Sequence, residues 1–217
     1  MRKGITAAEA AALIPDGASL MIGGFVGVGS PERIIDALVA RGARGLTVIA
    51  NDTARPGIGI GKLVEAGCVA RAIVSHIGTN PVTQQKMLAG EMAVELVPQG
   101  TLAERIRAGG AGLGGVLTPT GLGTLAAEGK PVIEVDGRPF LLERPLRAGF
   151  ALLHAQEADH EFNLTYRLTA TNFNPVMAMA ADCVIAEAVE IVPVGVIPPD
   201  AVRTPGILVH HLLERAH

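Results

Sequence analysis

The sequence predicts an α/β protein whose sheet is mainly parallel and carries helices on both faces. Short apolar runs suited to buried strands alternate with segments of helical spacing, each about ten residues long. Hydrophobic residues make up 49% of the chain but aromatic residues only 3%, so we expect a core of Ala, Val, Ile and Leu, as in a parallel sheet enclosed by helices. We expect residues 1–217 to form a single domain.

The elements follow from local signals along the chain. Thr6 and Glu9 form a capping box that predicts a helix as far as Leu13, because each side chain can satisfy the backbone N–H of the other residue. A turn at 15–17 then leads into a strand at 19–22. The alternation continues with helices at 31–41, at 60–66 and from Asn80-Pro81, with strands at 46–50, 70–75 and 94–97, and with a helix capped by Thr101 and Glu104.

The second half of the chain starts with an unusual glycine-rich segment at 109–124. Its composition disfavours a helix or a central strand, and we expect an ordered loop, either packed on its own backbone or lining a binding site or a subunit interface. Asp136-Gly137 between two apolar runs, 131–135 and 138–142, predicts a hairpin. Strands at 149–154 and 183–187 flank a short helix that begins at Asn174-Pro175.

Composition excludes several classes of protein. The net charge is −3 and no basic run occurs, which disfavours nucleic acid as a partner. The N-terminus has no apolar signal-peptide core, and apolar stretches such as 178–189 contain Asp182 and Glu187 and are too short for a membrane span. We therefore expect a soluble, cytoplasmic protein that does not contact membranes.

Cysteine and histidine spacing does not indicate a metal site. Cys68 and Cys183 lie far apart, so we expect buried thiols in a reducing compartment rather than a redox pair or zinc ligands. His210, His211 and His217 have no carboxylate or thiol at ligand spacing, and we expect them at the surface. Met177 and Met179 are expected to fill the core, and Glu104, Arg105 and Arg107 to form a solvated helix face.

The stretch from Asp16 to Pro31 carries the strongest functional signal. It runs from a buried strand through a glycine-rich turn into a helix that starts at Ser30-Pro31-Glu32. Backbone N–H groups at such a turn, with a helix N-terminus behind them, predict a site for a phosphate, carboxylate or oxyanion. The spacing G-x-x-G-x-G reverses the dinucleotide-binding order, and no nucleoside-triphosphate motif is present. A purely structural turn is the alternative.

Polar and glycine residues follow four predicted strands in turn. Because parallel strands end at one edge of a sheet, we expect these residues to share a rim where ligands bind: Gly23, Gly24, Asn51, Asp52, His76 and Gln99. Ser75 and His76 are adjacent on a strand and point to opposite faces, which disfavours a nucleophile and base pair. Asp52 stands where a ribose-binding acid would stand in a dinucleotide fold, but the glycine order weakens that interpretation.

Residues 16–31 resemble the signature of the alpha subunit of family I coenzyme A transferases, which move CoA between carboxylic acids. The resemblance continues in order over nearly the whole chain, through LTVIANDT (46–53), SHIGTNP (75–81), VPQGTLAERIRAGGAG (97–112), TPTGLGT (118–124), LLERPLRA (141–148), NLTYR (163–167) and TNFNP (171–175). It implies the three-layer fold of CoA transferases and NagB-like proteins.

The resemblance also implies a shared active site. Such enzymes react by a ping-pong mechanism through a glutamyl-CoA thioester, and their nucleophilic glutamate lies in an S-E-N-G motif on the beta subunit. No S-E-N-G occurs in this chain, so we expect it to be inactive alone and to need a beta subunit, in an α2β2 heterotetramer. The CoA thioester is then a substrate, and no permanently bound cofactor is expected.

The family pattern assigns roles to particular residues. Gln99 corresponds to a side chain near the acyl carboxylate and the reactive glutamate, where a neutral amide can donate to an oxyanion. Asn51 and the backbone of Gly110 or Gly112 are further catalytic candidates. The segment assigned to CoA binding is Gly23, Gly24, Phe25, Val26, Gly27, Val28 and Gly29.

The substrate is less closely defined. SHIGTNP and the preceding NDT resemble the acetate/acetoacetate type, which indicates a short-chain acyl-CoA and a small carboxylate such as acetate. The alternatives are 3-oxoadipate or succinate transferases, which bind a second carboxylate, with Arg55, Arg105 and Arg107 as candidates. Two alternatives belong to different functional classes. One is an NAD-dependent oxidoreductase, which NAD(H) binding would reveal. The other is a noncatalytic α/β binding subunit, and a neighbouring gene for an S-E-N-G chain would argue against it.

Overall fold

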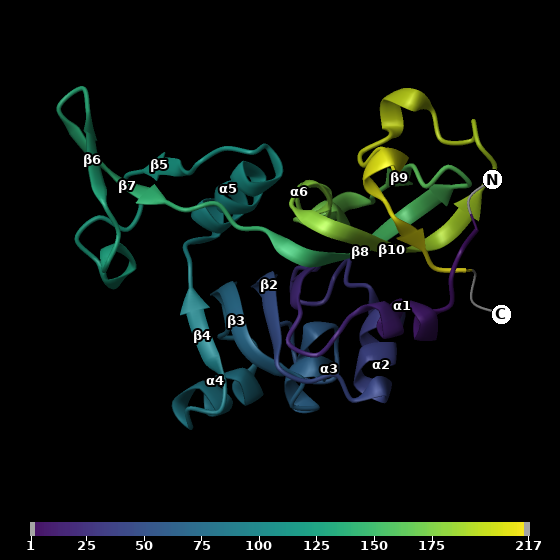
Figure 1. Cartoon of the computed structure of the whole chain (residues 1–217), viewed down its shortest axis with the longest axis horizontal. Coiled ribbons are helices and arrows are strands. Elements are labelled where there is room, and N and C mark those ends of the chain that lie inside the picture. The colour runs from purple at the N-terminus through teal and green to yellow at the C-terminus, as the bar shows by residue number, and fades with distance from the viewer. Residues whose placement is uncertain (1–2, 215–217) are drawn as a thin grey trace.

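The computed structural model describes residues 3–214, and a long parallel sheet dominates it (Figure 1). The strand order is β11-β10-β8-β1-β2-β3-β4, and every pair in this series is parallel. The strands are β1 (Ser19–Ile22), β2 (Leu46–Asp52), β3 (Val69–His76), β4 (Ala93–Leu96), β8 (Ala148–Asp159), β10 (Ala181–Val192) and β11 (His211–Leu212). The short β9 (Leu164–Thr165) pairs antiparallel with β8. The predicted mainly parallel α/β sheet is confirmed.

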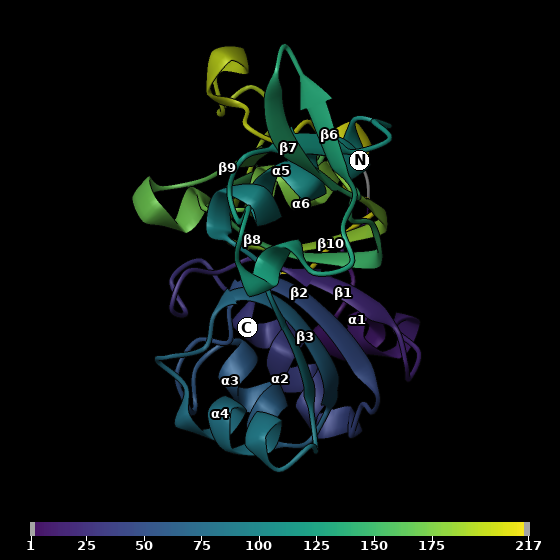
Figure 2. The same ribbon diagram turned by 90° about the vertical axis from the view of Figure 1, so that its left-hand side faces the viewer.

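Helices cover both faces of this sheet (Figures 1 and 2). One face carries α1 (Ala7–Leu13), α2 (Glu32–Arg41), α3 (Ile60–Glu65) and α4 (Pro81–Leu88), and the other carries α5 (Gln99–Gly110) and α6 (Asn174–Met179). Strand β1 shows how the sequence divides the core, because successive side chains point to opposite faces. Leu20 and Ile22 pack with α1 to α4, whereas Met21 packs with α5 and α6.

Local capping signals operate as the sequence predicts. The Oγ1 atom of Thr6 accepts a hydrogen bond from the backbone N–H of Glu9 at 3.1 Å, and the backbone N–H of Thr6 donates to the Glu9 carboxylate at 2.8 Å. Asn80 caps α4 by accepting from the N–H groups of Val82 and Thr83. Strands β2, β3, β8 and β10 extend beyond the predicted limits.

Helix α5 departs from the prediction at both ends. Pro98 is its N-cap residue and Gln99 its first residue, so Thr101 lies inside the helix and does not form the expected capping box. Gly109 and Gly110 belong to the last turn of the helix rather than to a loop. A Cβ atom on Gly109 would overlap the carbonyl oxygen of Leu146, so glycine is used here for a close approach of helix and chain.

A second, three-stranded antiparallel sheet extends away from the main one (Figures 1 and 2). It consists of β5 (Val116–Thr118), β7 (Arg138–Glu143) and β6 (Val132–Val135), in that order. The hairpin predicted at Asp136-Gly137 is confirmed, with φ of 49° and 72° at the two residues. Residues 109–124 therefore divide among α5, β5 and turns. Short 3-10 helices complete the fold, namely η1 (Leu125–Ala127), η2 (Leu168–Thr171), η3 (Pro199–Ala201) and η4 (Gly206–Leu208).

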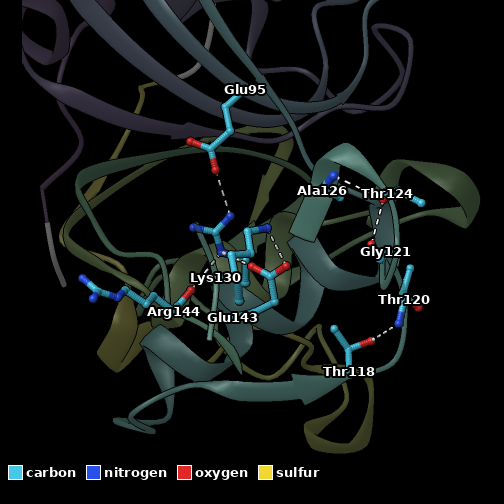
Figure 3. A network of polar contacts seen from close by, with 10 residues as sticks. Glu95, Thr118, Thr120, Gly121, Thr124, Ala126, Lys130, Glu143 and Arg144 are labelled. Atoms are coloured by element: carbon cyan, nitrogen blue, oxygen red, sulfur yellow. Dashed lines mark hydrogen bonds and ion pairs between the residues drawn. The ribbon is translucent and has the colours of Figure 1, made fainter. Parts of the chain in front are cut away.

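A partly buried ionic cluster connects the two sheets (Figure 3). The Arg105 guanidinium contacts Glu95 of β4 at 3.0 Å and donates to the backbone oxygen of Arg144 at 2.8 Å, and it lies 3.8 Å from Glu143. Lys130 pairs with the other oxygen of Glu143 at 2.6 Å. The predicted solvated face is thus wrong for Arg105, which is buried because its partners come from other elements.

Other sequence expectations have mixed outcomes. Met177 is buried as predicted, but Met179 is 43% exposed; Cys68 is buried and Cys183 only half-buried. His217 lies outside the described residues. Within residues 3–214, no helix is long and apolar enough to cross a membrane, and no cluster of His, Cys, Asp or Glu has the composition of a metal site.

Candidate functional site

Strands β1 to β4 lie side by side and parallel, so the residues that follow them meet at one edge of the sheet. The predicted rim is confirmed for Asn51 at the end of β2, for the glycine loop after β1 (Gly23 to Gly29), and for Gln99 after β4. His76 ends β3 with an exposed side chain, and the neighbouring Ser75 donates its hydroxyl to the backbone oxygen of Asn51 at 2.7 Å. Ser75 and His76 therefore do not act as a pair.

A continuous series of hydrogen bonds joins the candidates. The amide nitrogen of Gln99 donates to Oδ1 of Asn51 at 2.5 Å. The amide nitrogen of Asn51 then donates to Oδ2 of Asp52 at 2.6 Å, and the same oxygen accepts the backbone N–H of Val26 at 2.9 Å. Gln99 is exposed, whereas Asn51 and Asp52 are buried. The exposed amide is thus connected through two buried side chains to the glycine loop.

Most backbone N–H groups of the glycine loop are already used within the protein. Phe25 and Val28 exchange hydrogen bonds, Gly23 donates to the backbone oxygen of Leu152, and Gly24 donates to the side chain of Asn172. Among the described residues, the N–H groups of Gly27 and Gly29 have no such acceptor. Only part of the turn can therefore offer backbone N–H groups to an anion.

The N-terminus of α2 is occupied as well. A carboxylate oxygen of Glu187, on β10, accepts from the backbone N–H groups of Arg33 at 3.0 Å and Ile34 at 3.2 Å. The helix predicted to start at Ser30-Pro31-Glu32 begins one residue later in the structure. Its first residue is Glu32, Pro31 is the N-cap residue, and no local side chain caps the helix. Glu187 thus satisfies the donors that the sequence left for a ligand.

Two asparagines of the TNFNP motif hold the glycine loop from outside. Asn172 accepts from the N–H of Gly24 and donates to the backbone oxygen of Val28 at 3.1 Å. Asn174 is fully buried, accepts from the N–H of His154, and donates to the backbone oxygen of Gly29 at 3.2 Å. The motif is visible in the sequence, but this role is not, because the contacts span about 145 residues.

The tip of the glycine loop presents apolar side chains to solvent. Phe25 is 40% exposed and Val28 52% exposed, and Ile58 of the neighbouring loop is also exposed. A Cβ atom on Gly27 would lie 2.5 Å from Ile58 Cγ2, so these two loops are in close contact. An apolar part of a ligand can therefore pack beside the two N–H groups that remain available.

A groove of about 440 Å³ begins next to Gln99, between the start of α5 and the small sheet. Its lining residues are Gly100, Thr101, Glu104, Val116, Leu117, Thr118 and Thr120. The part of the 109–124 segment that forms β5 therefore lines a groove beside the rim. Gly110 packs against Met179 and is not among the residues that line this groove.

The contacts of the remaining candidates differ, and they show which side chains are already engaged within the protein. Arg105 is engaged in its ionic cluster, so it is not free to bind a second substrate carboxylate, and Arg107 forms an exposed pair with Glu104 at 2.8 Å. Arg55 is exposed, and within residues 3–214 no acidic side chain pairs with it. Asp52 lies buried under the glycine loop with both oxygens engaged by the protein, which contradicts a ribose-binding role.

Comparison with known proteins gives a consistent picture. The sequence model of the family described as Coenzyme A transferase matches residues 5–215. The acetate CoA-transferase subunit alpha of Escherichia coli (strain K12) is 52% identical over 209 residues, which cover 96% of this chain and 95% of the relative. The acetoacetyl-CoA:acetate/butyrate CoA transferase alpha subunit of Clostridium acetobutylicum is 49% identical, over 92% of this chain and 91% of the relative.

A solved structure supports the same architecture. The acyl-CoA transferase of E. coli O157:H7, determined as a thioester complex with CoA, superposes with a TM-score of 0.87 over 97% of this chain. The match covers 46% of that longer chain at 24% identity. At this identity the likeness concerns the fold, which places the layers and the rim described above in a known arrangement.

Proposed function

Because this chain belongs to the coenzyme A transferase family, we propose that it is the alpha subunit of a heteromeric enzyme that acts on short-chain substrates. The enzyme moves CoA between acetoacetyl-CoA, or another short-chain acyl-CoA, and a small carboxylate such as acetate. The two relatives described above, which are named for acetate and acetoacetyl-CoA, support this substrate pair. We further propose that residues 1–217 fold as a single domain and that the enzyme works in the cytoplasm.

The proposed reaction uses a glutamate of a beta subunit, in an S-E-N-G motif that this chain lacks. Its carboxylate attacks the acyl carbonyl, which expels CoA as a thiolate and leaves an acyl-glutamyl anhydride. The thiolate attacks the glutamyl carbonyl of the anhydride, which releases the first carboxylate and forms glutamyl-CoA. A second carboxylate reverses both steps and leaves as the new acyl-CoA. CoA thus enters and leaves as substrate, without a permanently bound cofactor.

The observation that carries the proposal is the hydrogen-bonded series from Gln99 through Asn51 to the glycine loop. Gln99 is exposed at the rim, and its amide has a second hydrogen and an oxygen available beyond the bond to Asn51. We propose that this amide donates to the oxyanion that forms at the attacked carbonyl. A neutral donor stabilises that charge without binding the substrate acid too tightly in the ground state.

The glycine loop is the proposed CoA-binding segment. The available N–H groups of Gly27 and Gly29 can bind an oxygen of the thioester, and the exposed side chains of Phe25 and Val28 can pack against its aliphatic part. This division assigns the polar contacts to two glycines, rather than to the full turn as the sequence suggested.

A dicarboxylate substrate, as in 3-oxoadipate or succinate transfer, is the second candidate. It is favoured by one observation, namely that Arg55 is exposed and has no acidic partner within the described residues. A guanidinium in that position can bind a second carboxylate in bidentate fashion. Arg55→Ala would then reduce activity with a dicarboxylate acceptor and leave activity with acetate unchanged.

The decisive experiment measures consumption of acetoacetyl-CoA with acetate as acceptor. This chain alone is compared with the chain co-expressed with its S-E-N-G partner, and the mass of the complex tests the α2β2 assembly. Activity in the mixture alone supports a split active site. Assembly without activity contradicts the acetate/acetoacetate substrates, and succinate and 3-oxoadipate are then tested as acceptors.

A further inference from the structure

Asp52 is a buried carboxylate whose partners come from three separate parts of the site. It is 3% exposed, and its three donors are N–H groups of neutral amides. Oδ2 accepts from the backbone N–H of Val26 at 2.9 Å and from the side chain of Asn51 at 2.6 Å. Oδ1 accepts from the backbone N–H of Ala54 at 2.6 Å. One side chain therefore contacts the glycine loop, the residue that holds Gln99, and the turn that follows β2.

Two of these donors have an unusual backbone conformation. Val26 has φ of 50° and Ala54 has φ of 55°, both in the left-handed region that residues with a Cβ atom seldom adopt. Such conformations persist where the surrounding structure fixes them. Both N–H groups point at the same carboxylate, so Asp52 supplies a fixed acceptor for each strained residue.

The carboxylate also determines how the Asn51 amide is oriented. Because Asp52 accepts only, the nitrogen of the Asn51 amide faces Asp52 and its oxygen faces Gln99. The amide of Gln99 must then donate to Asn51, which fixes its own orientation at the rim. The acceptor at position 52 thus sets the orientation of the exposed Gln99 amide through a single side chain, that of Asn51.

We propose that Asp52 is a positioning residue for CoA transfer, which holds the glycine loop and the Asn51–Gln99 pair in a fixed relative position. This inference rests on the proposed function. Its chemical requirement is two acceptor oxygens on one buried side chain. Asparagine has a single acceptor oxygen. That oxygen can accept either from Val26 and Asn51 or from Ala54, and the amide nitrogen must then face an N–H donor on the other side.

The test uses Asp52→Asn in the complex of this chain with its S-E-N-G partner. Misplacement of the loop and of Gln99 is expected to lower kcat about 10- to 100-fold in a complex that still assembles. The matched control is Asp182→Asn, because Asp182 is an exposed aspartate paired with Arg147 on the surface, and we expect wild-type kcat there. Wild-type kcat in assembled Asp52→Asn would overturn the proposal.

A second pair of variants separates positioning from general stability. Glycine adopts positive φ without strain, so Val26→Gly in the Asp52→Asn background is expected to restore part of kcat. Ala54→Gly in the same background is expected to raise the thermal midpoint but leave kcat low. Each is compared with the same glycine substitution in the wild-type chain. Failure of Val26→Gly to restore kcat, or equal recovery of kcat with Ala54→Gly, would overturn the proposal.

Amide hydrogen exchange supplies a measurement that does not depend on the reaction. In Asp52→Asn, peptides that contain residues 23–29 are expected to exchange faster, while peptides from α1, which within the described residues has no hydrogen bond to Asp52 or to the turn that follows β2, keep their wild-type rate. Unchanged exchange in the loop would overturn the proposed anchoring. A wild-type complex without CoA-transferase activity, combined with faster exchange in the variant, would contradict the proposed function but not the anchoring by Asp52.

Discussion

The side-chain amide of Gln99 lies 2.5 Å from that of Asn51, although the two residues are 48 positions apart in the chain. Gln99 begins α5 and Asn51 lies near the end of β2, so the contact joins a helix on one face of the sheet to the rim of the sheet itself. The exposed member of the pair, Gln99, is accessible from solvent. The buried member fixes its orientation.

Replacement of Gln99 with alanine should leave subunit assembly intact and lower kcat. Loss of one oxyanion donor reduces turnover by roughly 10- to 1000-fold. Steady-state kinetics of the assembled complex measures the effect. Gln85→Ala is the matched control, since Gln85 is an exposed glutamine on α4, and it should retain wild-type kcat. Unchanged turnover in Gln99→Ala would remove Gln99 from the site.

Replacement of Gly24 with valine should distort the glycine loop. Gly24 has φ of +139°, and a Cβ atom there would overlap the hydroxyl oxygen of Ser30. We expect the KM for acyl-CoA to rise about tenfold or more, equivalent to 1.4 kcal/mol of lost binding. Gly90→Val isolates the backbone strain, because Gly90 has φ of +71° and open space around it. That control should lower the thermal midpoint without changing KM. Normal folding and normal KM in Gly24→Val would contradict a binding role for the loop.

Replacement of Glu187 with leucine should destabilise α2. The N–H groups of Arg33 and Ile34 would lose their acceptor, which costs about 1–3 kcal/mol for buried donors. Glu187→Gln keeps one acceptor oxygen and should cost less. Thermal unfolding of the assembled complex measures both, with the exposed Glu190→Leu as control. Equal midpoints for Glu187→Leu and wild type would show that the cap contributes nothing.

The cluster around Glu95 should make stability depend on acidic pH. Burial acts to raise the pKa of Glu95, but hydrogen bonds from Arg105 and Arg71 outweigh it and hold the pKa below the ordinary 4.5. A lowered pKa in the folded state gives stability that is complete above about pH 4.5 and is lost as the pH falls through the folded value.

Glu95→Gln measures this contribution. The midpoint difference between Glu95→Gln and wild type should be largest at neutral pH and should shrink on acidification. Glu104→Gln is the matched control, because the exposed Glu104–Arg107 pair contributes little. A difference that stays constant from pH 7 to acidic pH would contradict the assignment.

Elements with local signals could be predicted from the sequence. The Thr6–Glu9 capping box needs residues three positions apart, and the Asp136-Gly137 hairpin needs two adjacent residues that tolerate positive φ. The convergence of Asn51 and Gln99 at one rim also followed from the sequence, because parallel strands end on the same side. These features depend on short-range stereochemistry or on a general rule of topology.

Features that depend on distant partners could not be predicted. The sequence left the N-terminus of α2 open to a ligand, but Glu187 reaches it from 154 positions away. Arg105 has the spacing of a surface residue, and only the fold brings Glu95 and Glu143 around it. The engagement of the loop N–H groups by Asp52 and Asn172 has the same cause. The sequence indicates that the candidate residues share one rim, but only the fold shows which of their donors have no acceptor among the described residues.

The position of β8 between β1 and β10 has a consequence for synthesis of the protein. Strand β1 pairs with β2 on one side and with β8 on the other, and β8 is made about 130 residues after β1. While the ribosome translates the intervening residues, β1 has an apolar, unpaired edge. The asparagines that fasten the glycine loop emerge later still. Nascent chains are therefore most prone to aggregate before residue 159 leaves the ribosome, so chaperone binding should be strongest in that interval.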